Sequence, residues 1–243
     1  MAHGQPDWGV TAGAVTTYQL SDMGELAARL GSPDTYDRRG EIVFQDDFEG
    51  GLVKWNQSPF SGGSRIALDF TRARSGSACA LVRGSGVAGD GGELQATLHP
   101  LPLSGYGVEA TIQPVGGLQY ATLRIIHWSG GSLRYYECRI NAVNNTLERR
   151  AGLATWIVVA TIPTPATVPV SWHTLKLVMD AAANKYVRVL YDDASYDISG
   201  GSVHSAAAAN PGYLDVRLQA TTSGVAPGGA YFDDAIITAN EPA

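Results

Sequence analysis

The feature that most constrains the fold is a succession of short segments from Glu41 onward in which apolar residues recur at every second position. "LKLVMD" and "YVRVLY" show this alternation clearly, and it is typical of strands with one buried face. Clusters of Gly, Asn, Pro and Asp separate the segments, and no helical period lies between them. The sequence therefore predicts an all-β protein, a two-sheet antiparallel jelly-roll sandwich over residues 41–243.

Residues 1–40 have a different pattern and are predicted to form an N-terminal extended arm with one short helix. "SDMGELAARLGSP" has a capping box, a terminal glycine and then a proline, so the helix is expected over about 22–30. The arm is too short to bury its own apolar residues and is expected to dock on a neighbouring subunit. The anchors are Trp8, Tyr18, Met23, Leu26 and Leu30.

Composition and charge exclude several functions. Hydrophobic residues make up 44% of the chain and charged residues 16%, which favours a folded domain over a disordered one. A net charge of -6 argues against a nucleic-acid partner. No apolar run is long enough to span a membrane, and the amino terminus does not resemble a signal peptide. A particle assembled inside the cell, or a virion, is the expected location; an extracellular location is the alternative.

Three stretches carry a family resemblance: "DDFEGGLVKW", "SWHTLKLVMDAAANKYVRVLYDDASYDI" and "AYFDDAIIT". With them, residues 41–240 resemble the concanavalin A-like lectin and glucanase sandwiches, which include laminin-G-type and jelly-roll carbohydrate-binding modules. The resemblance implies that the first and last strands lie side by side. It specifies the fold much better than the function, because this fold hosts lectins, enzymes and scaffolds.

The resemblance also implies a structural calcium ion near the paired first and last strands. Asp47 or Glu49 would bind it together with Asp234, since carboxylates are hard oxygen ligands. The alternative is that these acids are solvated and discourage pairing at the strand edge. No other cofactor is expected.

A catalytic role is not predicted from the residues. Glycosidases need two carboxyl groups flanking the scissile bond, and the glucanase branch of the resembling family carries them on one strand as Glu-x-Asp-x-x-Glu. This chain has no such stretch; Glu137 and Glu109 stand alone in their strands. The histidines match no metal spacing, so the protein is expected not to be an enzyme.

Several aromatic residues are candidates for stacking on sugar rings, although cross-strand packing is the favoured explanation for them. Alternation puts Tyr135 and Tyr136 on opposite faces of their strand, one in the core and one exposed. Arg149 and Arg150 end a strand and are expected in solvent. Cys79 and Cys138 are expected as buried hydrophobic residues. The glycan-binding candidates are Tyr120, Trp128, Tyr135, Tyr136 and Trp156.

Two functions from different classes follow. The first is a non-enzymatic assembly protein, a capsid-decorating or tail-associated virion subunit that forms a homo-oligomer or larger assembly, because the arm is similar to arms of phage structural proteins. The alternative is a carbohydrate-binding module that binds surface glycans. A glycoside hydrolase or lyase is the third and least favoured function.

Overall fold

The structure is a computed structural model that describes residues 10–11, 14–15, 39–99, 104–129, 131–163, 171–208 and 212–242. The chain divides into two compact units, Met1–Arg38 and Arg39–Ala243. In the first unit, β1 (Val10–Thr11) and β2 (Ala14–Val15) pair antiparallel. The predicted helix and the five arm anchors lie outside the described residues. No helix occurs among the residues that are described.

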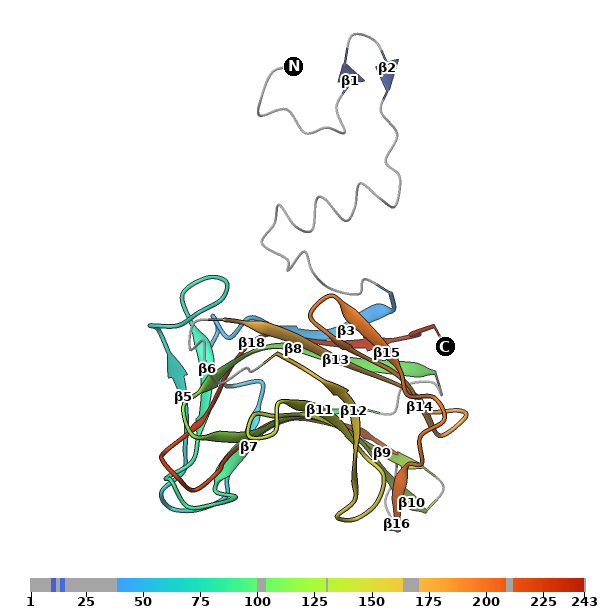
Figure 1. The fold of residues 1–243 in the computed structure, drawn as a ribbon. Coiled ribbons are helices and arrows are strands. Elements are labelled where there is room, and N and C mark those ends of the chain that lie inside the picture. The colour runs from blue at the N-terminus through green and yellow to red at the C-terminus, as the bar shows by residue number, and fades with distance from the viewer. Residues whose placement is uncertain are drawn as a thin grey trace. The chain divides into compact units, whose positions relative to one another are not determined.

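The second unit is a sandwich of two antiparallel sheets, stacked as layers in Figure 1. This confirms the predicted all-β sandwich of two antiparallel sheets. Sheet I runs in the order β12 (Trp156–Thr161), β11 (Thr146–Arg150), β10 (Ser132–Asn141), β9 (Leu118–Ser129), β17 (Leu214–Thr222), β7 (Gly91–Leu98) and β4 (Asn56–Pro59), and β16 (His204–Ala207) also pairs with β10. Sheet II runs in the order β15 (Ala194–Asp197), β14 (Lys185–Tyr191), β13 (His173–Asp180), β8 (Gly105–Val115), β18 (Gly229–Ala239), β6 (Cys79–Arg83) and β5 (Arg65–Asp69), and β3 (Glu41–Asp46) also pairs with β18.

The core lies between the sheets because alternate residues of each strand point inward. In sheet I, Leu123 and Ile125 of β9 and Cys138 of β10 are fully buried, and Leu177 of sheet II is buried as well. The residues between them in sequence therefore form the outer face of sheet I. The sheet bends so that this outer face is concave (Figure 1).

The first and last strands of the sandwich are neighbours, as β3 pairs antiparallel with β18. Phe48 is fully buried and stacks on Trp55, with ring centroids 5.9 Å apart. The Trp55 indole nitrogen donates a hydrogen bond of 2.7 Å to Asp46, which is itself buried. The opening acidic stretch is thus fixed to the core by aromatic packing.

A group of buried charges lies where β8, β13, β14 and the C-terminal segment meet. Glu241 accepts ion pairs of 2.7 Å from both Lys176 and Arg188. The Thr238 hydroxyl donates to the same carboxylate at 2.6 Å. A Cβ atom on Gly107 would lie 2.9 Å from this carboxylate, so the glycine leaves room for it. These contacts hold the end of the chain against sheet II.

The described residues contain no helix that is long and apolar enough to cross a membrane. Both cysteines are free and buried. Burial raises the pKa of the Cys79 thiol to about 12, which makes it an inert thiol.

Candidate functional site

The outer face of sheet I carries a row of charged and polar residues that runs across five strands. Strand register places Arg217 of β17 beside Gln95 of β7 on one side and Arg124 of β9 on the other. Arg124 in turn lies beside Glu137 of β10, and Arg150 continues the row on β11. These strands are far apart in sequence and meet only in the folded sheet.

Ion pairs connect this row into a network. Glu93 of β7 accepts a hydrogen bond of 2.5 Å from Arg217 and an ion pair of 3.5 Å from Arg124. Arg124 also lies 3.2 Å from Glu137. Glu137 accepts a very short hydrogen bond from Arg150. One carboxylate therefore sits between two guanidinium groups in the centre of the face.

Glu137 and Asp215 each keep one buried oxygen without a partner among the described residues. Glu137 is only 1% exposed, and its Oε2 accepts no hydrogen bond. Asp215 pairs with Arg217 at 2.7 Å, but its Oδ1 also has no donor. Burial raises the pKa of Asp215, and the nearby Arg217 opposes this effect. Unsatisfied buried acceptors are costly, and these two oxygens are the carboxylate acceptors of this face that lack a donor among the described residues.

A stack of aromatic and cationic groups flanks the row on one side. The guanidinium of Arg139 lies between the rings of Tyr120 and Trp156, at 3.6 Å and 3.7 Å from their centroids. Arg139 also pairs with Glu148 at 2.6 Å. Burial opposes ionisation of Glu148, but hydrogen bonds, above all from Asn141, outweigh it and hold its pKa below the usual value. The stack is thus a rigid part of the face.

A second aromatic group flanks the row on the other side. Tyr135 of β10 stacks on His204 of β16, with centroids 5.2 Å apart, and Arg150 lies 5.1 Å from the same tyrosine ring. Trp128 and Tyr213 pack together with ring centroids 3.9 Å apart. A charged centre with aromatic groups on both flanks suits a ligand that has both hydroxyl groups and apolar C–H faces.

The structure brings four of the five aromatic candidates to this face: Tyr120, Trp128, Tyr135 and Trp156. The structure corrects the prediction for the fifth candidate, Tyr136. It is fully buried and packs edge-on against Tyr186 in the core, because β10 alternates and Tyr135 takes the outer position. A sugar cannot reach Tyr136 in this fold.

The charged residues of the face were not singled out from the sequence. Arg150 was expected in solvent, yet it binds Glu137 and the backbone oxygens of Gly152 and Leu153. The only available signal was alternation, which puts the ionic residues of β10 and β17 on the face opposite the core. Glu93, Arg124, Arg150, His204, Asp215 and Arg217 complete the site.

The acids proposed for calcium already have protein partners. Glu49 accepts hydrogen bonds from the Ser77 hydroxyl and from the backbone N–H groups of Ser77 and Ala78. Asp234 pairs with Arg74 at 3.2 Å. Among the residues that the structure describes, Asp47 accepts a hydrogen bond only from the backbone N–H of Glu49. Within the described ranges, no group of three or more His, Cys, Asp or Glu residues could hold a metal ion, and calcium stays a prediction.

Asp233, next to Asp234, provides a prediction on pH. Burial, and then the charge of Asp234, raise the pKa of Asp233 to about 6, and backbone hydrogen bonds from Arg74 and Ser75 oppose the shift. The pKa of Asp233 is higher in the folded state than in the unfolded state. The stability that its protonated carboxyl group contributes is therefore fully present below about pH 4 and is lost as pH rises through about 6. We expect the free energy of unfolding of wild type to fall by about 1 kcal/mol between about pH 5 and pH 7.5, relative to that of D233N. Urea denaturation of both proteins measures this difference.

The titration of His127 also contributes to the pH dependence of stability, in both wild type and D233N. Burial lowers its pKa, so its contribution changes in the opposite direction over the same pH range. It is present in both proteins and cancels in the difference. Parallel stability curves for wild type and D233N would show that Asp233 is ionised in the folded state.

Comparison with known proteins supports the fold at low sequence identity. No family model matches the chain, and no curated protein matches it. Among solved structures, the endo-beta-1,4-glucuronan lyase of Trichoderma reesei aligns with a TM-score of 0.55 and 12% identity, over 82% of this chain and 95% of that one. A Bacteroides ovatus family 16 endo-glucanase has a TM-score of 0.51 at 12% identity, over 81% and 100% of the two chains. The Crh5 transglycosylase has a TM-score of 0.51 at 14% identity, over 86% and 90%.

These comparisons contradict the prediction of a non-enzymatic virion assembly subunit. The three structures that share the sandwich are, by name, a lyase, an endo-glucanase and a transglycosylase. The expectation that the protein is not an enzyme rested on the missing one-strand motif, and this reasoning was wrong. The outer face of sheet I gathers Glu93, Glu137, Glu148 and Asp215 from four different strands. At this identity the likeness establishes the fold and leaves the reaction open. Subunit partners stay a prediction.

Proposed function

We propose that the protein binds a polysaccharide across the outer face of sheet I and cleaves it there, with Glu137 as the proton-transferring group. One observation carries this proposal. Glu137 lies in the centre of a concave face, held by Arg124 and Arg150, with one buried oxygen that no described residue satisfies. Positioned carboxylates that exchange protons with a glycosidic oxygen or a ring carbon cleave sugar polymers.

The rest of the face is suited to holding a sugar chain. The Tyr120–Arg139–Trp156 stack lies on one side of Glu137, and the Tyr135–His204 pair lies on the other. Aromatic rings bind the apolar faces of pyranose rings, and the polar groups between them fix the hydroxyl groups. The likeness in fold to a glucuronan lyase and an endo-glucanase supports the same substrate class.

The experiment is a cleavage assay on a panel of neutral β-glucans and uronate polymers. We expect new reducing ends from at least one polymer. Unsaturated ends, detected by their ultraviolet absorbance, would identify elimination, and their absence from a productive digest would identify hydrolysis. A purified, folded protein that neither cleaves nor binds any polymer of the panel would refute the proposal.

A second candidate is polysaccharide binding without cleavage. The observation in its favour is that each of the four carboxylates on this face is ion-paired with an arginine, an arrangement that differs from the acid and base pair of a glycosidase. Binding of a polymer in a pull-down assay, with no release of reducing ends after long incubation, would favour this candidate.

A further inference from the structure

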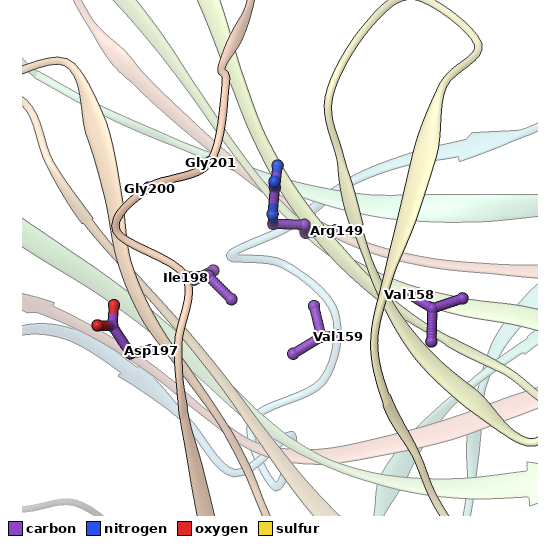
Figure 2. A pocket seen from close by; sticks show the side chains of 7 residues that line it. All are labelled: Arg149, Val158, Val159, Asp197, Ile198, Gly200 and Gly201. Carbon is purple, nitrogen blue, oxygen red and sulfur yellow. The ribbon is translucent and has the colours of Figure 1, made fainter.

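A separate pocket opens at the edge of the sandwich, where strands β11 and β12 of sheet I face the segment that follows β15. Its volume is about 260 Å³, which is just below the usual range for drug-sized ligands and limits the pocket to a small molecule. Figure 2 shows the Arg149 guanidinium beside the segment of Gly200 and Gly201, with Val159 and Ile198 approaching from opposite walls. The pocket therefore has a cationic end and an apolar wall.

Arg149 and Arg150 are consecutive on β11, so their side chains point to opposite faces of sheet I. Arg150 belongs to the network on the outer face. Arg149 points to the side of sheet II, where its guanidinium lies 5.7 Å from the Tyr186 ring. The pocket is thus distinct from the proposed catalytic face.

Arg149 carries a charge that no carboxylate in the described part of the chain balances. Its one hydrogen bond is a long one of 3.4 Å to the backbone oxygen of Ser202. Asp197 lines the same pocket but accepts a hydrogen bond from the Ser199 backbone instead, and its carboxylate points away from Arg149 (Figure 2). A guanidinium has five N–H donors in a planar fork, and the described residues supply an acceptor to only one of the Arg149 nitrogens.

The guanidinium is nevertheless held in place. The Tyr186 ring lies on one side, and a Cβ atom on Gly201 would come within 2.5 Å of the Arg149 guanidinium carbon. Glycine at this position therefore lets the backbone pack directly on the cation. A preorganised fork loses little freedom when it binds a planar anion.

We propose that this pocket binds a small organic monocarboxylate of monosaccharide size, with uronic acids as the class. A carboxylate matches the guanidinium fork with two parallel hydrogen bonds. One cation with an aspartate nearby favours a monoanion over a phosphate dianion. Val159 and Ile198, on opposite walls, supply apolar surface for the C–H faces of a sugar ring. This inference does not depend on cleavage at Glu137.

The test is isothermal titration of the full-length chain with D-glucuronate, D-glucose and inorganic phosphate. We expect glucuronate to bind, and R149Q to weaken binding at least about tenfold because a charged hydrogen-bonding pair is lost. G200W is expected to block the pocket without unfolding the protein, since a Cβ atom on Gly200 meets nothing within 4 Å. G116W is the matched control, as Gly116 is equally open but lies in the β8–β9 turn.

The outcomes separate this site from the outer face. Binding that persists in E137Q and is lost in R149Q and G200W supports the pocket. Binding that is lost in E137Q but unchanged in R149Q would assign the sugar to the outer face and overturn the inference. Equal affinity for phosphate or glucose, or no glucuronate binding to folded wild type, would overturn it as well.

Discussion

Glu137→Gln is expected to lower the rate of polysaccharide cleavage by about 10³-fold while the protein stays folded. Glutamine has the same shape, and its side-chain oxygen can still accept the hydrogen bond from Arg150 and lie beside Arg124, the two residues that hold the carboxylate in wild type. It cannot take up and release a proton. Arg124 also keeps Glu93 and Gln219 as partners, so the network survives in part. Initial rates on the polymer identified by the panel measure the effect.

The matched control is Glu93→Gln. Glu93 is also buried on the outer face of sheet I and shares Arg124 with Glu137, but it lies on β7, which β9 and β17 separate from β10. We expect E93Q to lower the rate less than about tenfold, because it changes the charge of the network without touching the reacting group. An equal loss in both variants would mean that the charge balance of the face, and not Glu137 itself, supports cleavage.

The sheets could be predicted from the sequence because alternation is a local property. Residues such as Leu175 and Leu177 show it directly, and both are buried in the core. The pairing of β3 with β18 joins the two ends of the sandwich. It was predicted from the family resemblance, which implies that the first and last strands lie side by side.

The site could not be predicted in the same way, because it depends on strand order. Glu93 and Glu137 approach the same guanidinium only because β7, β17, β9 and β10 are adjacent in that order. No local sequence pattern encodes this order of the strands in the sheet. The search for two acids on one strand therefore missed acids that lie on different strands. Tyr135 and Tyr136 show the limit of alternation, which separated the two faces but left open which tyrosine was in the core.

Glu241→Ala is expected to destabilise the fold by about 3 kcal/mol, since removing one partner of a buried ion pair leaves the other charges poorly compensated. The Glu241 carboxylate has no exposed surface and binds Lys176 and Arg188 at 2.7 Å each. In E241A, Lys176 still has Glu109 as an ion-pair partner at 3.5 Å. The expected loss of stability therefore lies at the lower end of the range for broken buried ion pairs. The midpoint and slope of urea denaturation give the change in the free energy of unfolding.

Glu41→Ala is the control for this prediction, because it removes the same charge from the exposed start of β3, where Glu41 accepts one hydrogen bond of 3.0 Å from Asn240. Its effect is expected to stay below about 0.5 kcal/mol. Glu241→Gln keeps the side-chain volume and the acceptor for Thr238 but removes the charge. Its decrease in the free energy of unfolding should therefore lie between those of E41A and E241A. If E241A were no less stable than E41A, the C-terminal segment would contribute nothing to the sandwich, and the ion pairs with Lys176 and Arg188 would be energetically neutral.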